Sequence, residues 1–154
     1  MRLPFKALLL AACSVLTFTA VTPASAQFAK PEDAIKYREA AMTLMSAHVG
    51  RIFAMANGKM PFDAKAVAEN AEIAAAVSTW QFTGFVEGSD KGKTRAEPKI
   101  WTEMAKFREM ADKNHQDVVK LNEAAKTGNL DTIKAAVGAV GKSCKACHDS
   151  YRKD

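Results

Sequence analysis

The sequence DTIKAAVGAVGKSCKACHDSY, residues 131–151, indicates the class of fold that this chain adopts. Its apolar residues recur at spacings of three and four, which places them along one side of an α-helix. A seam of this kind packs against neighbouring helices at shallow angles. The segment therefore predicts a helix that runs to the C-terminus within a bundle. Its apolar positions are Ile133, Val137, Val140, Cys144, Cys147 and Tyr151.

Two further helices are predicted in the first half of the chain. One begins at Pro31, because proline suits the first turn of a helix, and its periodicity fades near residues 58–61. The next follows Asp63, whose carboxylate is suited to cap the free backbone N–H groups of a helix start, and ends around residues 78–84. A loop from Gly84 to Glu97 then interrupts the helical pattern.

A third helix is predicted from Pro98 to Gly128, and a fourth begins at Asn129 or Asp131. Glycine just past the last turn suits the left-handed conformation that ends many helices. No stretch of the chain alternates between apolar and polar residues as a β-strand does. Four helices with short connections predict an all-α fold, an antiparallel four-helix bundle.

The first 26 residues are predicted to be a signal peptide. Arg2 and Lys6 give a basic start, residues 7–21 are almost entirely apolar, and Ala24-Ser25-Ala26 offers the small residues of a cleavage site. Cleavage there leaves one domain, residues 27–154, exported to the periplasm.

A lipoprotein signal is the alternative interpretation of this leader. Leu10-Ala11-Ala12 would then precede a lipidated Cys13. The apolar run before Cys13 is unusually short for such a signal, so we expect cleavage after Ala26.

The charge pattern bears on possible partners. The formal net charge is +5, and the basic residues are interleaved with acids apart from the cluster Lys91, Lys93 and Arg95. This pattern is typical of a solvated surface rather than of a nucleic-acid site. No apolar stretch after the leader reaches the roughly 18 residues that a membrane-spanning helix needs. We expect binding neither to nucleic acid nor to a membrane.

The motif Cys144-Lys145-Ala146-Cys147-His148 carries the chemistry of the chain. Its spacing is that of c-type haem attachment, in which two thiols add across the haem vinyl groups and the imidazole binds the iron. Residues three and four apart share one face of a helix. We predict one haem c, bound covalently through Cys144 and Cys147, with His148 as the iron ligand.

Two other interpretations of the motif stay open. A redox dithiol is expected at the start of a helix that follows a strand, whereas this motif lies in the last turns of a helix. A zinc site needs a fourth ligand beyond the motif, and His48 and His115 are single residues far away in the sequence.

A sixth iron ligand has to come from upstream or be absent, because the motif ends six residues before the C-terminus. Most methionines in an alanine-rich bundle fill gaps in the core, and single histidines more often lie at the surface than bind metal. The upstream candidates are Met42, Met45, Met55, Met60, Met104, Met110, His48 and His115.

With this motif near its C-terminus, the segment from Gln27 to Asp154 resembles cytochrome c′, the class of c-type cytochromes with a C-terminal haem. The resemblance is looser from Phe53 to Gly92. It implies a four-helix bundle, a five-coordinate high-spin haem with His148 as proximal ligand, and a homodimer whose interface is formed by the first two helices. The most specific parts are Gln27–Ala34 with Tyr37 and Arg38, Glu97–Trp101, and Ser143–Arg152.

The resemblance also implies roles for residues outside the motif. Arg38 and Glu39 fall where the first helix contacts the haem edge and its propionates, although Glu39 departs from the amide or basic residue often found there. Met42 falls where a bulky side chain covers the open face of the iron. Thr94 and Arg95 match two loop positions that approach the haem. Arg152 matches a basic residue beside the proximal imidazole, and Phe85 matches a residue that lines the distal side.

An iron with an open coordination position in an apolar pocket binds small diatomic gases. The leading hypothesis is a periplasmic haem protein that binds nitric oxide and carbon monoxide and/or carries electrons to or from an unidentified redox partner. The alternative is a six-coordinate, low-spin electron-transfer cytochrome with Met42 as sixth ligand. We expect no enzymatic activity, because no distal acid–base pair is evident in the sequence.

Overall fold

The computed structural model of the chain describes residues 27–153, so the predicted signal peptide and Cys13 lie outside the described residues. Four long helices make up most of this part. They are α1 (Pro31–Ala56), α2 (Ala64–Val77), α5 (Met104–Lys126) and α6 (Leu130–Tyr151). Two single-turn helices, α3 (Trp80–Thr83) and α4 (Lys99–Thr102), lie within the long connection between α2 and α5.

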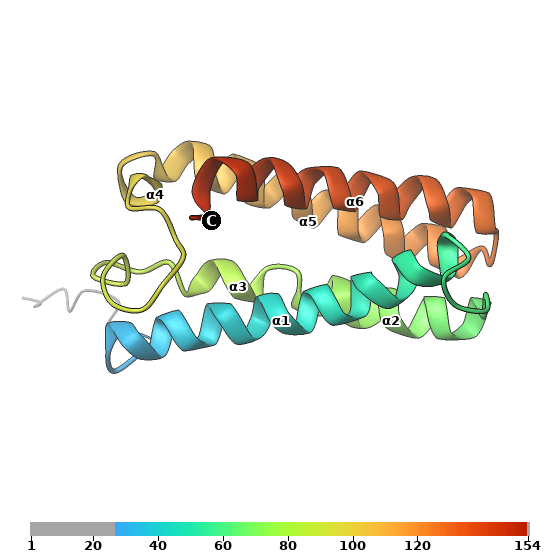
Figure 1. The fold of residues 1–154 in the computed structure, drawn as a ribbon, viewed down its shortest axis with the longest axis horizontal. Coiled ribbons are helices and arrows are strands. Elements are labelled where there is room, and N and C mark those ends of the chain that lie inside the picture. The colour runs from blue at the N-terminus through green and yellow to red at the C-terminus, as the bar shows by residue number, and fades with distance from the viewer. Residues whose placement is uncertain (1–26, 154) are drawn as a thin grey trace, which may run out of the picture.

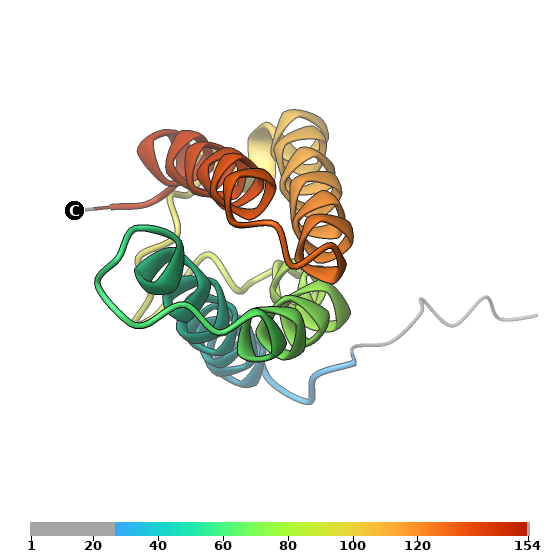
Figure 2. The ribbon, with the colours of Figure 1, turned by 90° about the vertical axis from the view of Figure 1, so that its right-hand side faces the viewer.

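The long helices form a closed ring of neighbours. Helix α1 packs against α2 and α6, and α5 packs against α2 and α6; viewed from one end, the four helices occupy the corners of a bundle (Figure 2). The side view shows the α3–α4 connection passing around one end, next to the C-terminal end of α6 (Figure 1). The all-α four-helix bundle predicted from the sequence is confirmed. No helix within residues 27–153 has the length and apolar character needed to cross a bilayer.

The predicted helix boundaries hold where capping residues define them. The Asp63 carboxylate accepts hydrogen bonds from the backbone N–H groups of Lys65 and Ala66 at 2.9 and 3.1 Å. Asn129, rather than Asp131, caps α6, because its side chain accepts from the N–H of Thr132 at 2.9 Å. These bonds satisfy donors that have no partner within the first turn of a helix.

The prediction of a single helix from Pro98 to Gly128 is wrong, because the helical backbone is interrupted at Glu103, between α4 and α5. Glu103 has φ −114° and ψ 30°, outside the α-helical region. Contacts with distant segments hold α4 and Glu103 in positions that do not continue the axis of α5. Trp101 Nε1 donates to the backbone oxygen of Val86 at 2.9 Å, and the Tyr151 hydroxyl donates to Glu103 Oε2 at 2.9 Å.

The hydrophobic core is divided into two clusters. The larger one fills the bundle between all four long helices and includes Ile52 and Leu121, whereas the smaller one includes Ile100 and Tyr151. Cys144 packs against the edge of the larger cluster and Cys147 against the smaller one. The cysteine motif therefore lies where the apolar core is interrupted.

Candidate haem site

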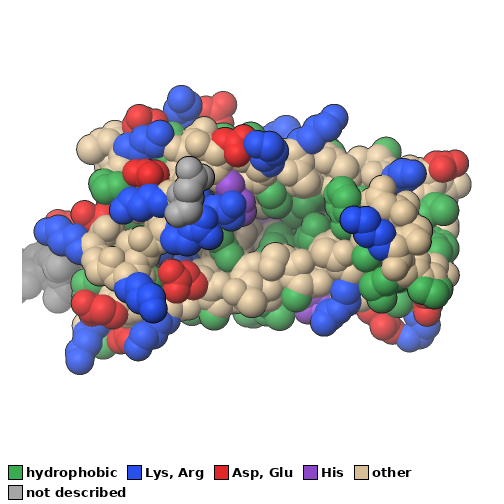
Figure 3. All heavy atoms as spheres, viewed as in Figure 1, with side chains coloured by type: hydrophobic (Ala, Val, Ile, Leu, Met, Phe, Trp, Pro, Cys, Tyr) green, Lys and Arg blue, Asp and Glu red, His purple; other side chains and the backbone are tan. Residues whose placement is uncertain are grey.

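Two cavities adjoin the cysteine motif. Cavity 1 has a volume of about 290 Å³ and cavity 2 of about 370 Å³. Met42 on α1 and Cys147 and His148 on α6 line both of them. The space-filling view shows hydrophobic side chains lining the hollow between α1 and α6, with basic side chains gathered toward one end (Figure 3). The motif thus faces an apolar space that extends to both sides of His148.

Cavity 1 lies on the side of the larger core cluster. Helix α1 contributes the apolar side chains of Met45, Val49 and Phe53 to its wall, and Phe82 and Met110 add to this apolar surface. Two buried amides interrupt this apolar wall, Gln81 from α3 and Asn114 from α5.

Cavity 2 lies beside the connection between α3 and α4. The structure brings together here the residues that the resemblance singled out, although they come from α1, the loop and α6. Glu39 and Arg95 are exposed at its rim, whereas Arg38 is buried. The predicted residues that line cavity 2 are Arg38, Glu39, Met42, Phe85, Thr94, Arg95, Cys147, His148 and Arg152, and Cys144 lines cavity 1.

Arg38 is a buried cation that forms no ion pair with a carboxylate among the described residues. Its side chain is only 2% exposed. It donates to the backbone oxygen of Gly84 at 3.0 Å, to Oγ and the backbone oxygen of Ser89 at 2.8 Å each, and to Oγ1 of Thr94 at 2.7 Å. The guanidinium carbon lies 4.5 Å from the centre of the Phe85 ring, within the range of a cation–π contact. Burial lowers the pKa of Arg38, whereas the nearby carboxylates of Glu39 and Asp90 raise it. The groups that bond the guanidinium are thus neutral, and its positive charge lines cavity 2, where it would attract an anionic group.

We expect Arg38→Met to lower the free energy of unfolding by about 2–4 kcal/mol, because it leaves the buried backbone oxygen of Ser89 without its donor and removes the hydrogen bonds to Gly84 and Thr94. The measurement is urea unfolding followed by circular dichroism. Arg51→Met is the matched control, since Arg51 lies on the same helix and is exposed; it should change the free energy by less than about 1 kcal/mol. Equal losses in the two variants would contradict a structural role for the buried guanidinium.

His148 has a guanidinium beside one of its ring nitrogens. Arg152 Nη1 lies 3.0 Å from His148 Nδ1, and since a guanidinium only donates, this contact makes Nδ1 the acceptor and places the proton of a neutral imidazole on Nε2. Burial, followed by the charges of Arg152 and Arg95, lowers the pKa of His148. The imidazole is therefore favoured in its neutral form, which is the form that ligates a metal.

The two thiols lack the features of a redox dithiol. Burial, and then the neighbouring Cys144, raises the pKa of Cys147 to about 11. Burial also raises the pKa of Cys144, although a hydrogen bond from Asn114 opposes the shift. A reactive dithiol requires a lowered thiol pKa, so the site disfavours this interpretation.

The two upstream histidines lie away from the motif and bond elsewhere. His48 Nδ1 lies 2.8 Å from Oδ1 of Asn70, and His115 Nδ1 lies 2.6 Å from Oγ of Ser78. Neither residue lines cavity 1 or cavity 2. Within residues 27–153, no group of three or more His, Cys, Asp or Glu side chains is arranged to hold a metal ion. The zinc interpretation therefore finds no fourth ligand here.

Sequence reasoning missed three buried polar residues around the site, namely Gln81, Ser89 and Asn114. A signal existed for Asn114, because it falls between Ala111 and Val118 on the inner stripe of its helix. No comparable periodicity marks Ser89, which lies in the loop.

Comparisons with known proteins agree with this geometry. Residues 33–152 match the family described as Cytochrome C′. The chain belongs to the cytochrome c′ family. It is 49% identical over 128 residues to cytochrome c′ of Rubrivivax gelatinosus, covering 82% of this chain and 99% of that protein. It is 45% identical over 127 residues to the protein of Alcaligenes xylosoxydans xylosoxydans, covering 82% and 98%.

Solved cytochrome c′ structures share the fold. The Rubrivivax gelatinosus crystal structure aligns with a TM-score of 0.80 at 49% identity, covering 82% of this chain and all of that one. A nitric oxide complex of a variant from Alcaligenes xylosoxidans aligns with a TM-score of 0.78 at 44% identity, covering 83% and 99%.

The cofactor of this cytochrome c′ is covalently attached haem c, and the residues present fit this group. Two thiols and a neutral imidazole lie together in the last turns of α6. Apolar space adjoins them, and the buried guanidinium of Arg38 lines cavity 2, where it would attract the anionic edge of a haem. These three features together suit a haem bound through two thioethers and an axial histidine.

Proposed function

We propose that the chain is a periplasmic cytochrome c′ that binds nitric oxide and carbon monoxide and carries electrons, with haem attached at Cys144 and Cys147 and held by His148. When bound, the haem supplies an iron whose open position takes a diatomic gas and whose two oxidation states differ by one electron. The nitric oxide complex of the Alcaligenes xylosoxidans protein supports the gas-binding part of this proposal.

The gas-binding part of the proposal rests on the position of Met42. Its side chain is half-buried on α1 and, together with His148 across the bundle, lines both cavities. An apolar side chain there excludes water and fills the space beside the imidazole. Bound dioxygen gains little from such surroundings, whereas nitric oxide and carbon monoxide need no hydrogen-bond donor.

The other site residues have supporting roles. Arg38 and Arg95 would receive the anionic edge of the haem in cavity 2, and Arg152, which lies 3.0 Å from His148 Nδ1, would place a positive charge beside the imidazole. Thr94 fixes the Arg38 guanidinium. We assign none of these residues a catalytic role and propose a binding and electron-carrying protein rather than an enzyme.

The visible spectrum of the ferrous protein tests the proposal. A high-spin spectrum supports an open iron position. A low-spin spectrum supports the second candidate, a six-coordinate electron-transfer cytochrome with Met42 as sixth ligand. Met42 is the methionine that fits this role, because it lines both cavities, whereas Met45 and Met110 line cavity 1 and not cavity 2. The sulfur of a methionine is an established axial ligand of haem iron.

Processing gives a separate prediction. We expect the intact mass of the exported protein to equal residues 27–154 plus one haem, because Ala24-Ser25-Ala26 precedes the cleavage site. Mass spectrometry of the periplasmic fraction checks this. A mass that begins at a lipidated Cys13 would replace the periplasmic assignment with a membrane-anchored one.

A homodimer through the first two helices stays part of the proposal. Exposed apolar side chains on this half of the bundle support it, namely Leu44 on α1, Ile73 on α2 and Trp80 on α3, which are 40%, 41% and 47% exposed. Burial of such side chains against a second copy would be favourable.

A further inference from the structure

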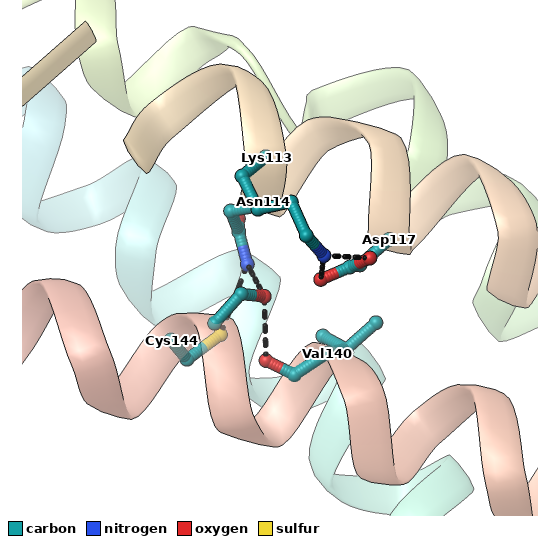
Figure 4. Close-up of polar contacts among 6 residues, drawn as sticks. Lys113, Asn114, Asp117, Val140 and Cys144 are labelled. Carbon is teal, nitrogen blue, oxygen red and sulfur yellow. Dashed lines mark hydrogen bonds and ion pairs between the residues drawn. The ribbon is translucent and has the colours of Figure 1, made fainter. Parts of the chain in front are cut away.

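The sulfur of Cys144 has a hydrogen-bond donor from another helix (Figure 4). Asn114 Nδ2, on α5, donates to Cys144 Sγ at 3.3 Å and to Ser143 Oγ at 3.0 Å. Among the described residues, the sulfur of Cys147 has no such donor, although its side chain is also half-buried. The two cysteines of one motif thus have different polar surroundings.

The orientation of the Asn114 amide follows from its neighbours. The Ser143 hydroxyl donates its only proton to the backbone oxygen of Val140 at 3.1 Å, so Ser143 Oγ is left as an acceptor. An amide oxygen turned toward it would meet a second acceptor, and therefore the nitrogen end of Asn114 faces Ser143 and Cys144. A thioether sulfur has lone pairs and no proton. The same N–H donor consequently suits Cys144 both before and after attachment.

The amide is also fixed in place. Asn114 is 4% exposed, and a buried amide is stable only when it is hydrogen-bonded. The ion pair of Lys113 and Asp117, which flank Asn114 on α5, takes no part in its bonds (Figure 4). Asn114 lines cavity 1 beside Cys144, so its hydrogen bond restrains the sulfur at the wall of that cavity.

We propose that Asn114 is a positioning residue for haem attachment, holding the Cys144 sulfur for addition to a vinyl group and then donating to the thioether. In this addition the sulfur forms a bond to one vinyl carbon, the thiol proton moves to the other, and no net oxidation or reduction occurs. The inference rests on the proposed attachment at Cys144 and Cys147.

Asn114→Leu tests the proposal, because leucine is similar in size and lacks the donor. The full chain is expressed with a bacterial haem-attachment system, denatured and treated with iodoacetamide, and free cysteines are counted by peptide mass. We expect unattached Cys144 to increase about fivefold, the factor that one hydrogen bond contributes, with unattached Cys147 unchanged. Gln81→Leu is the matched control, since Gln81 is a buried amide of the same cavity that donates to Ser78 instead; it should change neither cysteine.

The reduction potential of the doubly attached fraction is a second readout. It should fall in Asn114→Leu and not in Gln81→Leu, because a donor directed at the thioether stabilises the reduced haem. Asn114→Asp, with the same shape and no amide donor, should reproduce the Cys144 result if the leucine variant folds poorly. If the wild-type protein carries no covalent haem, the proposed attachment site is wrong. If the wild-type protein forms two thioethers but the Asn114 variants show equal amounts of free thiol at both cysteines, only the proposed role of Asn114 is wrong.

Discussion

The double variant Cys144→Ala, Cys147→Ala is expected to retain less than about a tenth of the haem of wild type after denaturation, because no covalent bond remains. Each single variant keeps one thioether, so its haem should stay with the denatured chain but retain one vinyl group. Haem staining of a denaturing gel and extraction with acidified organic solvent distinguish these cases. Loss of haem should also lower the melting temperature, since a ligand that binds only the folded state stabilises it.

Ser150→Ala is the control for these variants, because Ser150 lies on α6 next to the motif and lines neither cavity. It should keep a full haem-stained band. A stained band in the double cysteine variant would show that the attachment site is wrong.

Met42→Ala is expected to raise carbon monoxide affinity by about tenfold if the iron is five-coordinate. The substitution removes three heavy atoms from the wall of both cavities, so an incoming ligand no longer has to displace a packed side chain, a difference of about 1.4 kcal/mol. The ferrous spectrum should stay high-spin, since no bond to iron is lost. Carbon monoxide titration followed in the visible range gives both quantities.

Met55→Ala controls for loss of stability, because Met55 is buried in the core and lines neither cavity. Its carbon monoxide affinity should equal that of wild type. If Met42 is instead the sixth ligand, wild type is low-spin and Met42→Ala becomes high-spin with a lower reduction potential. That result would replace gas binding by electron transfer alone.

The local features of the fold were predictable because they depend on neighbouring residues. The three-four spacing of residues 131–151 gives α6, and the carboxylate of Asp63 begins α2 as expected. Asn129, one of the two predicted starts of the fourth helix, caps α6. The break at Glu103 was not predictable, because the contacts that hold it involve Val86 and Tyr151, which are distant in sequence. Helical periodicity reports only which face of a segment is apolar.

The haem motif is likewise local, since one turn of helix brings Cys144, Cys147 and His148 onto the same face. Burial of Arg38 depends instead on a loop some fifty residues away, whose Ser89 and Thr94 surround the guanidinium. The donor to Cys144 comes from α5, on a separate helix. The residue types and their spacing along the chain thus specified the helices and the attachment motif. Only packing between helices determined which charge is buried and which sulfur is hydrogen-bonded, because both depend on groups that the chain brings together after it folds.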